Sequence, residues 1–178
     1  NGARVDVGCD EVWPAGLTGA LAVAIHAPYS NVVVNVAIPF NAIVQGMPHT
    51  LVWQFHTDGG VDVVSNIWNA SHAWNTTGVF AAVCTAINND HSASATAMVH
   101  VTLPVTNYVS PGGGNVYPYD SWAKAALLIE DAAEAAAVGG LVLVSNGVYT
   151  APQGVVLWGK PLTVKSLAGW QETMLDGQ

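Results

Sequence analysis

Short runs of alternating apolar and polar residues fill positions 17–104, as expected for β-strands that bury one face. From Phe80 to Ala86, a period of two places Phe80, Ala82, Cys84 and Ala86 on the same face. Six strand-like runs rich in Val, Ile and Thr are separated by Pro, Gly, Asn and Asp: Ala20–His26, Val32–Ile38, Leu51–Phe55, Val61–Val64, Phe80–Ile87 and Ala95–Leu103. This spacing predicts a β-sandwich over residues 17–104.

The pattern changes after Pro104. Residues 105–119 contain Pro111-Gly112-Gly113-Gly114 and are interpreted as a linker. Beyond them the apolar period becomes helical, which predicts a helix capped by Asp120 or Ser121, running through Val138 and ended by Gly139. Its apolar stripe is mostly alanine and suits close approach to a flat surface: Trp122, Ala125, Ala126, Ile129, Ala132, Ala133 and Ala136.

Three short apolar runs follow the helix: Leu141–Val144, Val155–Leu157 and Leu162–Val164. Asn146-Gly147, Gly154 and Gly159 separate them. Strands this short cannot bury their faces alone, since each coil of a stacked solenoid needs a neighbour on both sides. We therefore expect residues 120–178 to be a cap helix and first coils, with an open end that another segment or another copy covers.

The amino-acid composition limits the kinds of partner that we expect. Charged residues make up 9% of the 178, against roughly 25% in ordinary globular proteins. The net charge is −8 and the basic residues are Arg4, Lys124, Lys160 and Lys165, so we expect no nucleic-acid partner. No membrane span is expected, because acidic residues interrupt the apolar stretch 125–144. The low charge fits an acidic extracellular protein or a surface hidden in an assembly or under glycan.

The start of the chain lacks a basic region followed by an apolar run, so for an exported protein we expect a mature or excised segment. Two sequons make Asn69 and Asn75 candidate glycosylation sites. Trp53 and Trp74 fit core positions. Four further tryptophans lie near predicted turns and suit an interface or stacking on sugar rings: Trp13, Trp68, Trp158 and Trp170.

Candidate catalytic and metal-binding side chains are dispersed along the sequence. The rear segment offers Glu172 and Asp176 as acids and Lys160 and Lys165 as bases, without clustering, and the six histidines show no metal-ligand spacing. We expect no catalytic residue, no resident metal and no cofactor. Loop oxygens of Asp58, Asp62 and Asn88–Asp90 leave a calcium site open. A Cys9–Cys84 disulfide also stays open, although an inward-facing Cys84 favours a free thiol.

The sandwich region resembles a PKD (polycystic-kidney-disease type) domain. The resemblance rests on four segments: Leu51–Phe55, Asp58-Gly59, Ser71–Trp74 and Gly78–Asn88. It implies an immunoglobulin-like sandwich. Gln54 and His56-Thr57 depart from the acidic and glycine residues of the family's turn, so a cation site attributed to that turn is not carried over.

The rear region looks like the N-terminal cap and first coils of right-handed parallel β-helix (pectin-lyase-like) proteins. Four segments carry this resemblance: Tyr108–Ser110, Tyr117–Ala123, Val142–Tyr149 and Lys160–Leu167. The front segment Ala3–Glu11 resembles the last strand with which such β-helices close, which makes residues 1–16 a closing strand and linker. In large bacterial surface proteins of this kind, a PKD domain can sit between β-helices.

These interpretations give a mainly β, non-enzymatic structural protein of the cell surface or extracellular space. We expect copies to join head to tail into a filament, the Val5–Gly8 strand of one completing the coils of the next. The expected interface residues are Val5, Val7, Trp122, Ile129, Leu162, Val164 and Leu175. Two alternatives stay open: a non-catalytic fragment of a carbohydrate-active β-helix enzyme, and an adhesin module that binds polysaccharide.

Overall fold

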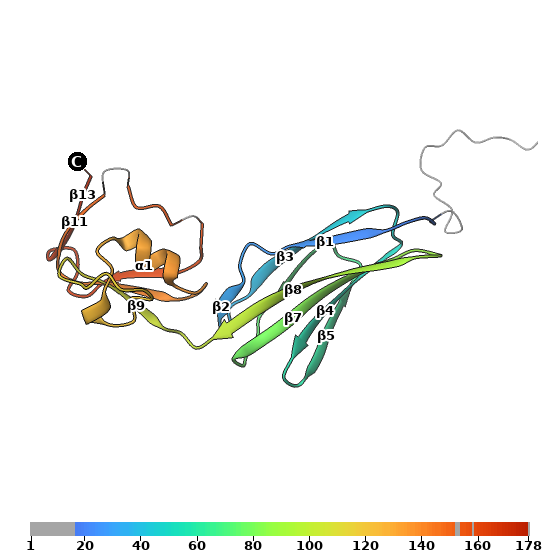
Figure 1. The fold of residues 1–178 in the computed structure, drawn as a ribbon, viewed down its shortest axis with the longest axis horizontal. Helices are drawn as coiled ribbons and strands as arrows, with labels where there is room; N and C mark the ends of the chain where they lie inside the picture. The colour runs from blue at the N-terminus through green and yellow to red at the C-terminus, as the bar shows by residue number, and fades with distance from the viewer. Residues whose placement is uncertain (1–16, 152–153, 158, 178) are drawn as a thin grey trace, which may run out of the picture. The chain divides into compact units, whose positions relative to one another are not determined.

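The structure is a computed structural model that describes residues 17–151, 154–157 and 159–177. The protein is mainly β (Figure 1). Among the described residues, nine strands precede η2: β1 (Ala22–His26), β2 (Asn31–Val33), β3 (Ile38–Gln45), β4 (Thr50–Thr57), β5 (Gly60–Ser65), β6 (Asn69–His72), β7 (Gly78–Ile87), β8 (Ser92–Thr102) and β9 (Thr106–Val109). The elements after them are η2 (Trp122–Lys124), α1 (Ile129–Ala135), β10 (Leu141–Val144), β11 (Gly147–Thr150), β12 (Thr163–Ser166) and β13 (Thr173–Asp176).

The chain divides into two compact units. The first holds the described residues up to Ala27, together with Pro39–Ala70 and Ala81–Ala97. The second holds Pro28–Ile38, Ser71–Phe80 and the described residues from Met98 onward. The described residues form four sheets. Two consist of strands from the front of the sequence, the five-stranded β2-β8-β7-β4-β5 and the three-stranded β1-β3-β6. Two small sheets consist of the four-residue strands β9–β13: the three-stranded β12-β10-β9 and the two-stranded β11-β13.

An aromatic cluster fills the core of the first unit. Phe40 of β3 lies 5.5 Å from Phe55 and 6.1 Å from Trp53 between ring centroids, and both partners belong to β4. All three side chains are fully buried. The Trp53 indole donates a hydrogen bond to the carbonyl of Ile67 (3.0 Å), so its polar edge is satisfied. Two sheets thus pack face to face, as the alternating pattern predicted, and the core position expected for Trp53 is confirmed.

Cys84 lies on the inward face of β7 and is fully buried with a free thiol. Burial raises the pKa of this thiol to about 11, so it stays protonated and behaves as a small apolar side chain. Cys9 lies outside the described residues.

In the second unit, Trp74 stacks on Phe80 with ring centroids 6.0 Å apart, and Trp74 is buried as predicted. The backbone of β2 forms two hydrogen bonds with the segment after α1. The Val33 amide donates to the Val138 carbonyl (2.9 Å), and the Val138 amide donates to the Asn31 carbonyl (3.1 Å). Gly139 follows with a φ of +83°. A Cβ there would lie 2.6 Å from the Val36 side chain and 2.7 Å from that of Val33, so this approach requires glycine.

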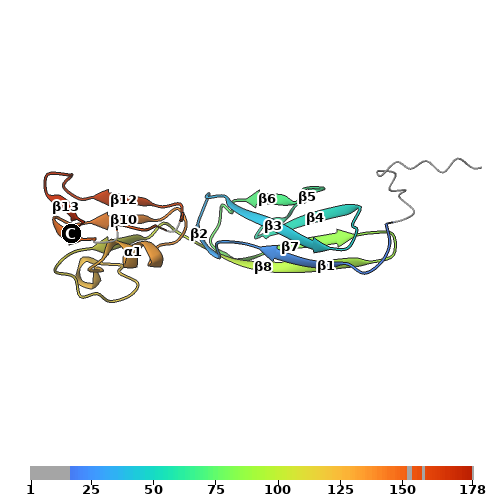
Figure 2. The same ribbon diagram turned by 90° about the horizontal axis from the view of Figure 1, so that it is seen from above.

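The two small sheets are parallel throughout. β10 pairs in register with β9 on one side and β12 on the other, and β11 pairs with β13. Figure 2 shows β12 beside β10. The core beneath them is formed by apolar side chains of β9–β11 and the α1 segment: Val109, Ala126, Ile129, Ala132, Ala133, Ala136, Val142, Val144 and Tyr149. Both sheets are open, so the described residues form stacked parallel strands rather than a complete parallel β-helix.

The long helix expected over residues 120–138 is wrong. The structure has the single turn η2 and the seven-residue α1, and Ser121 makes no side-chain cap hydrogen bond to η2. Between them, the Ala126 amide donates to the Tyr108 carbonyl and the Ala126 carbonyl accepts from the Ser110 amide, both at 2.9 Å. Pairing with β9 therefore replaces the helical hydrogen bonds of an alanine-rich segment.

The strand boundaries bring further corrections. The span 105–119, interpreted as a linker, contains β9, a member of the parallel sheet. Val155–Leu157 forms no strand, and Val32–Ile38 is not one strand, since β2 ends at Val33 and β3 begins at Ile38. Most of β3, together with β6, β11 and β13, lies outside the predicted strand runs.

Candidate assembly edge

The two ends of the three-stranded parallel sheet are unlike. At the β9 end, residues of the same chain cover the strand: Val109 forms a parallel bridge with Ala126, and the Tyr108 amide donates to the Tyr119 carbonyl (2.8 Å). At the other end, β12 pairs with β10 alone among the described residues, and β13 pairs with β11 alone. We call the outer sides of β12 and β13 the β12–β13 edge.

Side chains on neighbouring parallel strands form rows that share a face. Val142 of β10 is aligned with Val164 of β12, and Tyr149 of β11 is aligned with Leu175 of β13. Val142 and Tyr149 belong to the core cluster, so both rows point inward. Met174, beside Leu175, is aligned with the exposed Val148 and belongs to an outward row.

Burial falls sharply along the inward rows toward the β12–β13 edge. The exposed fraction rises from 0% at Val142 to 37% at Val164, and from 5% at Tyr149 to 56% at Leu175. Inward-facing apolar side chains are normally covered by the next strand of a stack. Among the described residues, the edge therefore presents a core surface beside strands that have a partner strand on one side, the arrangement that templates further strand pairing.

Hydroxyl groups join the successive strands at the corner between the two parallel sheets. The Tyr149 hydroxyl lies 3.0 Å from the Ser145 Oγ, and its one hydrogen is within reach of the carbonyls of Ser145 (3.0 Å) and Val109 (3.3 Å). One layer further, the Ser166 Oγ and Thr173 Oγ1 are 2.7 Å apart. The Thr173 Oγ1 donates to the Ser145 carbonyl (3.3 Å), which links the two layers. The corner thus fixes the spacing of the layers up to the edge.

Lys160 holds the segment that leads into β12. Its Nζ donates to the carbonyls of Ala133 (3.1 Å) and Glu134 (2.7 Å) in the last turn of α1, where a cation complements the helix dipole. Burial lowers the pKa of Lys160, and the nearby Glu134 opposes this shift. The Tyr29 hydroxyl donates to the adjacent Gly159 carbonyl (3.0 Å). Lys160 is thus half-buried and bridges the segment before β12 to the end of α1.

The structure brings some of the predicted interface residues together. Val164 and Leu175 lie on the β12–β13 edge, and Leu162 is half-buried against the core cluster. Ile129 is buried inside the same cluster. Trp122 lies apart from these, 39% exposed, and packs edge-on against Tyr108 with ring centroids 4.6 Å apart. Val5 and Val7 lie outside the described residues.

Sequence reasoning missed the corner hydroxyls Ser145, Ser166 and Thr173. A usable signal existed, because Ser145 directly follows the apolar run Leu141–Val144 and Ser166 stands two residues after the run Leu162–Val164. Hydroxyl side chains at that position can bond across strands without the long charged groups that burial disfavours. Recognising them required the register between β10 and β12.

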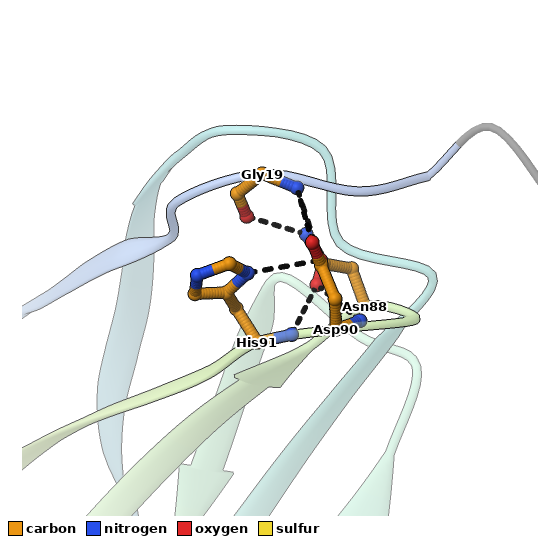
Figure 3. Close-up of polar contacts among 4 residues, drawn as sticks. All are labelled: Gly19, Asn88, Asp90 and His91. Atoms are coloured by element: carbon orange, nitrogen blue, oxygen red, sulfur yellow. Dashed lines mark hydrogen bonds and ion pairs between the residues drawn. The ribbon is translucent and has the colours of Figure 1, made fainter.

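A polar clasp in the first unit holds the segment that enters β1 (Figure 3). The Gly19 amide donates to the Asp90 carboxylate (3.0 Å), and the Gly19 carbonyl accepts from the Asn88 side chain (2.9 Å). The His91 Nδ1 lies 2.9 Å from the same carboxylate. The hydrogen bond from His91 and the one from Gly19 lower the pKa of Asp90. Asn88 and Asp90 were considered above as calcium ligands. In the structure, both side chains form hydrogen bonds to the backbone of Gly19, and the Asn88 side chain also accepts from the amides of Asp90 and His91.

The remaining candidates are dispersed over the described residues. Asn69 lies in β6 and Asn75 precedes β7, and both side chains are exposed. Trp68 and Trp170 are 52% and 85% exposed. Within the described ranges, no three His, Cys, Asp or Glu side chains gather as metal ligands. The helices described there are too short or too polar to cross a membrane.

Comparison with known proteins finds no matching family and no matching curated protein. Several solved structures share similarity with parts of the chain, among them the three that follow. The PKD domain of the human VPS10 domain-containing receptor SorCS2 is 17% identical, with a TM-score of 0.39, over 58% of this chain and 94% of that one. The CARDB domain of the PF1109 protein from Pyrococcus furiosus, solved with di-metal ions, is 16% identical with a TM-score of 0.34, over 47% and 94%.

The third structure is an engineered protein, 17% identical with a TM-score of 0.35; the match covers 46% of this chain and 20% of that one. At TM-scores this low, the fold of the chain rests on its own strand pairings. Those pairings give a mainly β protein with packed sheets in the front half of the sequence and short parallel sheets in the rear half.

Proposed function

We propose that this chain is a structural, non-catalytic subunit of an extracellular fibre, and that a strand from a second copy completes its β12–β13 edge. The observation that supports this proposal is the loss of cover along two inward rows, at Val164 and Leu175. Fully burying a Val or Leu side chain stabilises a protein by roughly 1.5–3 kcal/mol. A segment of a second copy that pairs with β12 over Val164 and continues past β13 over Leu175 therefore has a sizeable driving force.

In this proposal the parallel strands are the first coils of a right-handed parallel β-helix. β9, β10 and β12 form one wall, and β11 and β13 form a second. Crossover connections between parallel strands are right-handed in nearly all proteins, which supports that hand here. The packed sheets that precede them in the sequence are a PKD-like sandwich that acts as a spacer. The low content of charged residues fits a surface built for contact with other copies, outside the cell.

The assembly is proposed to be head to tail. Within the described residues, the outer side of β9 is covered by residues 119–126 of its own chain, whereas β12 and β13 each lack a second strand partner, so we place the acceptor surface at the β12–β13 edge. The donor is the Val5–Gly8 segment, which resembles a closing β-helix strand. A contact between two different surfaces, repeated from copy to copy, gives an open filament unless the rotation closes a ring.

A charge placed in an inward row tests this proposal. Leu175→Lys puts an ammonium group where the next strand must pack, and burying an unpaired charge is costly. We expect this variant to sediment as a monomer at concentrations where the wild-type chain forms larger species. Met174→Lys is the matched control, since Met174 is the adjacent, similarly exposed residue but belongs to an outward row. It should assemble as the wild type does.

Both variants should show the melting temperature of the wild-type monomer, because both side chains already face solvent in the single chain. Equal sedimentation of the Leu175→Lys and wild-type chains would contradict the proposed use of the edge.

A further inference from the structure

The side chains of β12 determine which residue pattern a strand needs in order to pair with the β12–β13 edge. On β12, Val164 and Ser166 continue the inward rows of Val142 and Val144. Lys165 between them continues the outward row of Leu143 and is exposed. A strand that adds parallel to β12 must therefore place two small apolar side chains inward, two residues apart. The residue between them lies directly beside Lys165.

The front segment of the chain meets the apolar requirement in three registers. Its sequence Ala3-Arg4-Val5-Asp6-Val7-Gly8-Cys9 alternates, with small apolar residues at every second position. Val164 can therefore lie opposite Ala3, Val5 or Val7. The residue beside Lys165 is then Arg4, Asp6 or Gly8, respectively.

The three registers differ in the charge of the residue that lies beside Lys165. Arg4 beside Lys165 places like charges directly opposite, which destabilises a strand pair, and Gly8 contributes no side chain. Asp6 beside Lys165 forms a pair of opposite charges. The middle register also places Val5 against Val164 and Val7 against Ser166, so branched apolar side chains continue both inward rows. Apolar pattern and charge thus select the same alignment.

We propose, resting on the proposed function, that residues 4–7 of a second copy add to β12 as a parallel strand in this register. Val5 covers Val164, and the Asp6 carboxylate pairs with the Lys165 ammonium group. The occupant of the edge is thus a named segment of a second copy, and the Asp6–Lys165 pair is its specificity determinant.

Charge exchange tests the register. Asp6→Lys and Lys165→Asp each replace attraction by repulsion, and we expect each single variant to weaken association about three- to tenfold. The double variant Asp6→Lys/Lys165→Asp restores an opposite pair and should recover wild-type association. The control Asp10→Lys, a charge change of the same size outside residues 4–7, should leave association unchanged. Sedimentation velocity over a concentration series measures all four variants.

Cysteine pairing tests the direction of the strand. In a Cys9→Ser background, Arg4→Cys chains are mixed with mass-tagged Thr163→Cys chains under mild oxidation. The parallel register places these positions opposite each other, so a mixed disulfide dimer should form. Gly8→Cys is the control partner, because an antiparallel strand centred on Asp6 would bring Gly8 to Thr163 instead. Cys84 should not interfere, since its buried thiol stays protonated.

The outcomes separate this register from the proposed function. If the wild type assembles and all charge variants assemble equally well, the register is wrong while the use of the edge stands. Crosslinking of Gly8→Cys in place of Arg4→Cys overturns the parallel direction. If the wild type stays monomeric at every concentration, the proposed function fails, and the register fails with it.

Discussion

Single residues decide how closely the segments of the second unit approach one another. Gly139 combines a left-handed backbone with van der Waals contact to Val33 and Val36, so it has two separate reasons to be glycine. Val164 and Leu175 show the opposite situation, because their rows continue a core but the side chains are exposed. Part of the apolar surface of these two side chains therefore stays exposed in the single chain.

Replacing Gly139 by alanine tests the first of these points. Gly139→Ala should lower the free energy of unfolding by about 2–4 kcal/mol, from the left-handed conformation and from overpacking against the two valines. Gly169→Ala is the control, since Gly169 has a similar φ of +89° but no neighbouring atom within 4 Å of the point where an alanine Cβ would lie. It should lose about 1–2 kcal/mol. Urea denaturation measures both, and equal losses would contradict the packing argument.

At the scale of elements, alternation located β4, β7 and β8 because each has one face that is more buried than the other, whereas β5 was located by its valines although all six of its residues are exposed. β4, β5, β7 and β8 contain or closely overlap their predicted runs. β3 was missed because Pro39 and Asn41 interrupt its pattern, and both are exposed outward positions of a strand paired with β1. β6 is short and polar, and its sequence Asn69–His72 carries no strand signal.

The rear elements show where tertiary pairing overrides local preference. The alanine-rich stretch has high helix propensity, yet Ala125 and Ala126 bond to residues 108–115 and leave the helix. Six residues of the predicted apolar stripe are nevertheless buried, because burial of small side chains depends on spacing more than on an unbroken helix: Ala125, Ala126, Ile129, Ala132, Ala133 and Ala136. The seventh, Trp122, is 39% exposed. The three short apolar runs predicted an open edge. Which side chains of that edge face inward follows only from the register between the strands, which the sequence does not give.

The clasp at the start of β1 is an element-scale device with a pH dependence. The lowered pKa of Asp90 means that the clasp is intact above the ordinary range of an aspartate and is lost as the pH falls through the lowered pKa. We expect the Gly19 amide resonance to shift in that acidic range as the hydrogen bond to Asp90 is lost. In Asp90→Asn, the Gly19 shift should not titrate there. A Gly19 resonance that titrates identically in both chains would contradict the assignment.

At the scale of the whole molecule, the proposed fibre has polarity because donor and acceptor are different segments of one chain. A chain lacking residues 1–11 keeps the acceptor edge and loses the donor, whereas Leu175→Lys keeps the donor and loses the acceptor. Each alone should be a monomer. Mixed in equal amounts, they should form a 1:1 dimer and nothing larger, as measured by light scattering after size-exclusion chromatography.

Formation of a dimer by either chain alone would show that a different surface drives association. A mixture that grows beyond the dimer would likewise contradict the assignment of one donor and one acceptor to each chain.

Electron microscopy of the purified wild-type chain over a range of concentrations tests the central claim most directly. Completion of the β12–β13 edge by a second copy predicts filaments or closed rings whose number rises with concentration. Monodisperse single particles at high concentration would contradict the claim.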